Sequence, residues 1–91
     1  LTLVAVHAEK DLLAQDWDAD IVLTGHTHRA SVEFTGKTLR VNPGHLKALK
    51  SRDTPAGFAL VSIEPHELYA ALIELDGNKR NELRVKRLRY A

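Results

Sequence analysis

The chain has 91 residues, of which 44% are hydrophobic and 27% charged, with a formal net charge of +1 and no cysteine. It is long enough for one small domain at most, or part of one, and its composition excludes wholesale disorder, disulfides and thiolate metal sites. The near-neutral charge excludes a strong global attraction to nucleic acid, and no segment is typical of a membrane span or a signal peptide, so we expect a soluble, cytoplasmic protein without a membrane partner.

The first predicted element is a strand over residues 1–6, a short apolar and β-branched run that ends at His7. Such a run is typical of a fully buried strand in a parallel sheet. Residues 8–15 space apolar side chains among charged ones, which predicts a short amphipathic helix. Because the chain lacks methionine and begins with a buried type of strand, we expect residues 1–91 to be the C-terminal part of a single domain whose N-terminal half is absent.

A second apolar run starts at Ile21 and ends at Gly25, and His26 and His28 follow it at a spacing of two. Strand, helix and strand at this spacing form a βαβ unit, in which the two strands are parallel. His7 and His26 then lie at the same edge of the sheet, where open α/β sheets place their sites. This arrangement favours metal binding. The alternative is that these histidines are polar loop residues that only solvate a turn.

The rest of the chain is predicted to be mostly β-structure. Turn residues separate the expected strands, and Asn42 is expected to fix the Asn-Pro-Gly turn through its own side chain. The expected elements are a hairpin of strands 31–35 and 38–42, then an exposed loop or one irregular helical turn over residues 46–54. A buried strand 57–63, a partner strand 68–75 and a final strand 82–90 with a bulge near Lys86-Arg87 follow.

In this order, three motifs resemble the C-terminal half of a calcineurin-like metallophosphoesterase of the small phosphodiesterase branch. They are His7 at a strand end, Gly-His-Thr-His-Arg over residues 25–29, and Val-Asn-Pro-Gly over residues 41–44. The resemblance implies an α/β fold, namely the C-terminal half of a four-layer α/β/β/α sandwich in which a βαβ unit is followed by mostly antiparallel strands. It also implies metal-dependent hydrolysis of phosphodiesters, with a phosphoester small molecule or a nucleotide as substrate.

The same resemblance implies a centre of two divalent metal ions that share a bridging carboxylate and a hydroxide. His7 and His26 resemble the histidines that bind the second ion, and His28 resembles a ligand of the first. Nitrogen- and oxygen-rich sites of this kind suit manganese, our first expectation, with iron, nickel or zinc as alternatives. Arg29 and His45 are the candidates for contacts with substrate.

The family's remaining ligands and its catalytic histidine come from the N-terminal half, and none of their motifs is in this sequence. No catalytic residue is therefore identifiable here, and we expect the isolated chain to be inactive unless its missing half is present in cis or in trans. Two local differences also stand out, because Ala8 and His45 occupy positions where the family usually has glycine and serine.

Two other functions stay open. One is a non-catalytic scaffold of the same fold that binds a protein partner, as a retromer subunit of similar fold does, or a second copy of the chain. The other is nucleic-acid binding by the basic tail, formed by Lys79, Arg80, Arg84, Lys86, Arg87 and Arg89. A charged edge strand that resists edge-to-edge pairing is the favoured explanation of that tail.

Overall fold

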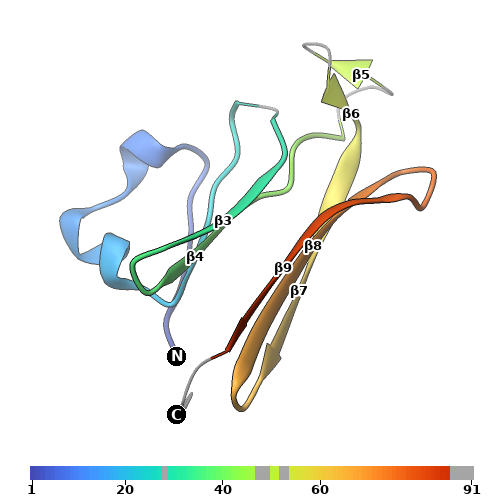
Figure 1. Ribbon diagram of the computed structural model, residues 1–91. Coiled ribbons are helices and arrows are strands. Elements are labelled where there is room, and N and C mark those ends of the chain that lie inside the picture. Colours follow the sequence, from blue (N-terminus) through green and yellow to red (C-terminus); the bar gives the residue numbers. More distant parts are fainter. Residues whose placement is uncertain (28, 47–49, 52–53, 87–91) are drawn as a thin grey trace.

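The computed structural model describes residues 1–27, 29–46, 50–51 and 54–86. These residues form nine strands and two short 3₁₀ turns (Figure 1). In chain order they are β1 (Leu3–Ala5), the turns η1 (Glu9–Asp11) and η2 (Ala14–Asp18), β2 (Ile21–Leu23), β3 (Ser31–Thr35), β4 (Thr38–Asn42), β5 (Lys50–Ser51), β6 (Thr54–Pro55), β7 (Gly57–Glu64), β8 (Glu67–Glu74) and β9 (Lys79–Lys86). Within the described residues, no helix has the length and apolar character needed to cross a membrane.

Two larger sheets organise the chain, and β5 and β6 form a separate two-stranded pair. The first sheet has the order β1-β2-β4-β3, in which β1, β2 and β4 are parallel and β3 is antiparallel to β4. The second sheet is the antiparallel meander β7-β8-β9. The βαβ interpretation is therefore confirmed for strand direction, and the carboxyl ends of β1, β2 and β4 meet at one edge of the first sheet.

The hydrophobic core lies between the two sheets. Alternate residues of β2 and β4 face alternate residues of β8 and β9, as the period of two in a strand requires. The buried side chains of this core are Ile21, Leu39, Val41, Leu68, Ala70, Leu72 and Val85. The fold is thus α/β, with the 3₁₀ turns, the first sheet and the second sheet as successive layers (Figure 1).

The turns are held by the face of β4 that points away from the core. We call the side chains of this face, Thr38, Arg40 and Asn42, the outer polar row of β4. Thr38 donates its hydroxyl hydrogen to the carbonyl of Ala19 at 2.6 Å, just beyond η2. The Arg40 guanidinium lies 4.4 Å from the ring centroid of Trp17 and pairs with Glu9 and Glu33. The connection between β1 and β2 is therefore fixed by polar contacts to the third parallel strand.

Two sequence-based expectations about the first 20 residues are wrong. Residues 8–15 do not form an amphipathic helix, because Leu12 and Leu13 are extended and separate two 3₁₀ turns that contain no buried residue. The Asp16 carboxylate accepts a hydrogen bond from the Leu13 amide at 2.8 Å, which holds the second turn. A segment of only eight residues is also too short to form a stable α-helix on its own. Strand β1 is not fully buried, because it is an edge strand and Leu3 is 45% exposed.

The C-terminal meander also differs in detail from the expectation. Strand β7 is half-buried on the face where Ala59 and Val61 pack against the core, and Phe58 and Leu60 on its other face are 42% and 53% exposed. Strand β9 starts at Lys79, three residues earlier than expected, and the register irregularity lies opposite Leu72/Ile73, at Arg80. At Lys86, where the expected bulge near Lys86-Arg87 would begin, the strand is still paired in register with Glu67, and residues 87–90 of the predicted strand lie outside the described residues. Part of the expected loop 46–54 instead forms the β5–β6 pair.

Candidate metal-binding site

His26 lies in a tight turn that directly follows β2. The Thr27 amide donates to the carbonyl of Gly25 at 2.9 Å, which closes a three-residue turn with His26 at its centre. The φ angle of His26 is 73°, and it is the only positive value among the described non-glycine residues. A turn of this kind is rare and strained for a residue with a Cβ atom. Strain of this sort persists only where the surrounding structure imposes it, and it is concentrated at functional sites.

The imidazoles of His7 and His26 face each other across the ends of β1 and β2. His7 Nε2 lies 3.1 Å from His26 Nδ1, and the ring centroids are 5.0 Å apart with an interplanar angle of 72°. The backbone joins the same two loops, because the Gly25 amide donates to the carbonyl of His7 at 2.9 Å. Residues 19 positions apart in the sequence are therefore brought together as the parallel pairing of β1 and β2 predicts.

This pair of nitrogens fits one divalent cation. Two ligands bonded to the same ion at roughly 2.0–2.1 Å, with an angle between about 90° and 109°, lie about 2.9–3.3 Å apart. The separation of 3.1 Å falls within that range, and it is also the length of the hydrogen bond in which one of the two ring nitrogens donates to the other. Among the residues that the structure describes, no group of three or more histidine, cysteine, aspartate or glutamate side chains converges, so this pair would need further ligands to complete a site.

A surface pocket of about 430 Å³ opens beside His26. It lies against the ends of β2 and β4 and combines hydroxyl, amide and cationic side chains, and its lining residues are Ala8, Glu9, Lys10, Thr24, His26, Thr27, Arg29, Ser31 and Asn42. Arg29 is therefore in the pocket, and its backbone amide donates to the Thr27 hydroxyl oxygen at 3.3 Å. The volume of this pocket, next to the histidine pair, is within the range of small-molecule sites.

The other candidate residues are placed differently. His45 is buried and lines a separate hollow with the start of β7, where its carbonyl accepts a hydrogen bond from the Gly57 amide at 3.0 Å. His28 lies outside the described residues. The structure thus brings together His7, His26 and Arg29, and the roles of Arg29 and His45 toward a substrate stay predictions.

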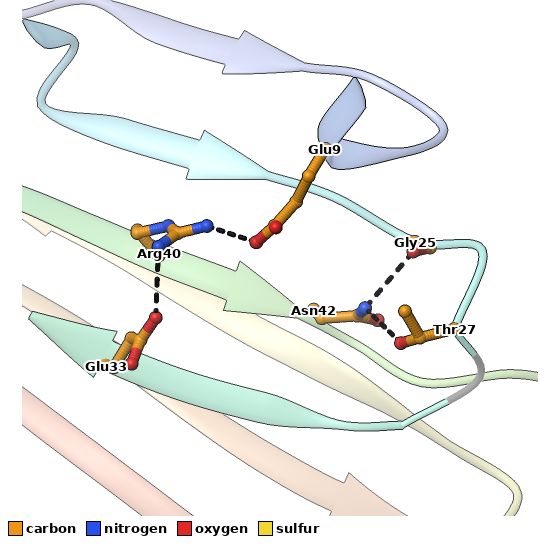
Figure 2. Close-up of polar contacts among 6 residues, drawn as sticks. All are labelled: Glu9, Gly25, Thr27, Glu33, Arg40 and Asn42. Carbon is orange, nitrogen blue, oxygen red and sulfur yellow. Dashed lines mark hydrogen bonds and ion pairs between the residues drawn. The ribbon is translucent and has the colours of Figure 1, made fainter. Parts of the chain in front are cut away.

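Asn42 has a larger role than the sequence indicates. Its side-chain oxygen accepts a hydrogen bond from the Gly44 amide at 3.0 Å, which confirms that it fixes the Asn-Pro-Gly turn. Its amide nitrogen also reaches the histidine turn and donates to the carbonyl of Gly25 and to the hydroxyl of Thr27 (Figure 2). The second set of contacts joins residues 15 and 17 positions apart, so no local pattern could have revealed it.

The comparisons with known proteins agree with this geometry. Residues 3–66 match the model of the calcineurin-like phosphoesterase superfamily domain. The chain therefore belongs to the calcineurin-like phosphoesterase superfamily.

Solved structures resemble it as well. A predicted phosphoesterase from Streptococcus pneumoniae TIGR4 is 26% identical, with a TM-score of 0.64 over 81% of this chain and 44% of that one. Vacuolar Protein Sorting 29 from Cryptosporidium parvum is 27% identical, with a TM-score of 0.66 over 80% and 40%. Vps29 from Entamoeba histolytica complexed with Zn²⁺ is 30% identical, with a TM-score of 0.56 over 79% and 42%. The chain spans less than half the length of each of these structures.

The strain at His26 should be visible in unfolding experiments. We expect His26→Gly to have a free energy of unfolding about 1–2 kcal/mol greater than His26→Ala, because only glycine adopts a positive φ without a steric penalty. Urea denaturation of the two variants measures the difference. Glycine is more flexible than alanine in the unfolded chain and would be the less stable variant at an unstrained position, so equal stability or the reverse order would show that the turn is not strained.

Proposed function

We propose that this chain supplies part of a dinuclear metal centre that hydrolyses phosphodiesters. The observation that carries the proposal is the approach of His7 Nε2 to within 3.1 Å of His26 Nδ1, beside a pocket that His26 and Arg29 both line. Without an ion this contact is a hydrogen bond in which one ring nitrogen donates to the other, and an ion bound between the rings would take the place of the shared hydrogen. Membership of the phosphoesterase superfamily supports the same function.

In this proposal each residue has a distinct task. His7 and His26 donate ring nitrogens to one ion, and His28 contributes to the other. Arg29, which lines the pocket, binds a phosphate oxygen of the substrate through its guanidinium in this proposal. Divalent ions, when bound, polarise the phosphoryl oxygens and lower the pKa of coordinated water. The bridging carboxylate and the remaining ligands come from the rest of the domain, in cis or in trans.

The ions are proposed to be manganese, with zinc as the alternative that one relative supports. Both metals accept imidazole nitrogen together with carboxylate oxygen. The Vps29 of Entamoeba histolytica has been solved with Zn²⁺, and this chain is 30% identical to it over the matched region.

The experiment is a hydrolysis assay of the full-length protein with bis(p-nitrophenyl) phosphate as a generic phosphodiester. We expect EDTA to reduce turnover to the background rate, because the ions supply the reactive water and the charge stabilisation. Addition of Mn²⁺ in excess of the chelator should restore it, whereas Mg²⁺, which binds imidazole weakly, should restore little. Turnover that survives complete removal of metal would contradict the proposal.

A protein-binding scaffold is the second candidate, and two observations favour it. Two of the similar structures are named for vacuolar protein sorting, and β7 exposes Phe58 and Leu60 on the face of the second sheet that points away from the core. In the same assay, a protein that binds metal but shows no turnover with phosphodiesters or phosphomonoesters would support this candidate over the enzyme.

A further inference from the structure

The turn that carries His26 is attached to β4 by one side chain. Asn42 is only 6% exposed, and both the nitrogen and the oxygen of its side-chain amide form hydrogen bonds. Its Nδ2 atom donates to the Gly25 carbonyl at 3.3 Å and to the Thr27 hydroxyl at 3.1 Å, while its Oδ1 atom accepts from the Gly44 amide at 3.0 Å. The two donated hydrogen bonds end on the residues immediately before and after His26, as Figure 2 shows for Gly25 and Thr27.

Contacts on both sides of His26 are what a strained turn requires. A residue with φ near 73° relaxes toward negative φ unless the peptide groups that flank it are held. Asn42 fixes the carbonyl of the preceding residue directly and fixes the following residue through its hydroxyl group. Asn42 ends β4, which pairs with β2 on one side and β3 on the other, so its own position is set by this pairing and by the core on the opposite face of β4.

The same contacts extend to the other histidine. The carbonyl of Gly25 accepts a hydrogen bond from the Asn42 side chain, and the backbone amide of Gly25 donates a hydrogen bond to the carbonyl of His7. The neighbouring member of the outer polar row, Arg40, pairs with Glu9, two residues after His7 (Figure 2). Strand β4 thus holds both histidine loops, although it carries neither histidine.

We propose that Asn42 is a positioning residue of the metal centre, which holds the strained turn of residues 25–27 so that His26 Nδ1 faces His7 Nε2. This inference rests on the proposed function, because it assumes that the two nitrogens bind a common ion. Asn42 itself is not a ligand in this proposal. Its effect on the ion is exerted through the turn, in the way that hydrogen bonds to a metal site orient its ligands.

The test is Asn42→Asp in the full-length protein, with Zn²⁺ as the probe in isothermal titration calorimetry. Aspartate keeps the volume of the side chain and an oxygen that can accept from Gly44, but it replaces the donor with a carboxylate oxygen that faces two acceptors. We expect zinc binding to weaken about 10–100-fold. We also expect the ring-nitrogen chemical shifts of His26 in the metal-free protein to change, which a merely structural role elsewhere would not produce.

Two further variants make the test specific. Asn81→Asp is the matched control, because Asn81 lies on β9 and accepts a hydrogen bond from the Glu82 amide through Oδ1, which aspartate retains. It should bind zinc like the wild type. Thr27→Val removes the hydroxyl that accepts from Asn42 and should weaken zinc binding about threefold to tenfold, whereas Thr27→Ser keeps the hydroxyl and should restore it. The Thr27 pair decides the question if Asn42→Asp does not fold.

The possible results distinguish failure of the positioning role of Asn42 from failure of the proposed metal site. Wild-type zinc affinity and unchanged His26 signals in Asn42→Asp, together with loss of binding in His26→Ala, would overturn the positioning role and leave the metal site intact. Wild-type affinity in both variants would instead overturn the proposed metal site. A loss of affinity in Thr27→Ser as large as that in Thr27→Val would also count against the positioning role.

Discussion

Replacement of His26 by alanine should abolish metal binding at the histidine pair and, with it, phosphodiester hydrolysis by the full-length protein. His26 supplies one of the two nitrogens that face each other at 3.1 Å, and alanine has no donor atom to replace it. We expect the Zn²⁺ dissociation constant at this site to rise by at least about 100-fold, because one remaining imidazole holds a divalent ion weakly. Calorimetric titration with Zn²⁺ measures the change.

The matched control is His66→Ala. His66 lies at the exposed turn between β7 and β8. His66→Ala therefore removes a side chain of the same type, but at the end of the second sheet. It should leave zinc affinity and turnover unchanged. If His26→Ala folds and keeps the wild-type zinc affinity and rate, the central claim about this site is wrong.

Leu39→Ala should produce the largest loss of stability. Leu39 is 0% exposed, lies on β4 between its partners Ile21 and Phe34, and packs in the core shared by the two sheets. Truncation of a buried leucine removes apolar contacts and leaves a cavity, and it typically costs about 2–5 kcal/mol. Because a small domain has little stability to spare, we expect a large shift of the urea unfolding midpoint or a chain that is substantially unfolded without urea.

Leu60→Ala provides the comparison at constant chemistry. Leu60 is 53% exposed on the outer face of β7, so the same truncation removes few buried contacts and leaves no enclosed cavity. Its free energy of unfolding should fall by about 0.5–1 kcal/mol at most. Equal losses for the two leucines would mean that the core is not where the structure places it.

Several features could be predicted because they depend on local patterns. The hairpin of β3 and β4 has the predicted bounds, since alternating residues on both sides of Gly36-Lys37 specify the strands and the turn. The approach of His7 to His26 follows from the rule that a βαβ unit makes parallel strands, which places both residues at one edge. One rule of chain topology thus located the candidate site.

Other features could not be predicted because they depend on contacts distant in sequence. The segment between β1 and β2 has apolar spacing that suits a helix, but its shape is set by Thr38 and Arg40 on β4. The positive φ of His26 could not be predicted from the residue type, since only a small fraction of non-glycine residues adopt it, even though histidine is among the enriched types. Asn42 shows only its turn-forming role in the sequence, because its contacts to Gly25 and Thr27 require β2 and β4 to be paired first.

The order of pairing in the first sheet also has a kinetic consequence. The β3–β4, β7–β8 and β8–β9 pairs join neighbours along the chain, whereas Leu3, Ile21 and Leu39 pair across gaps of 18 residues each. Loops of that length close more slowly than hairpins, so the parallel contacts form late in folding. The two histidines meet only after that step. A metal ion should therefore leave the refolding rate nearly unchanged and slow the unfolding rate instead.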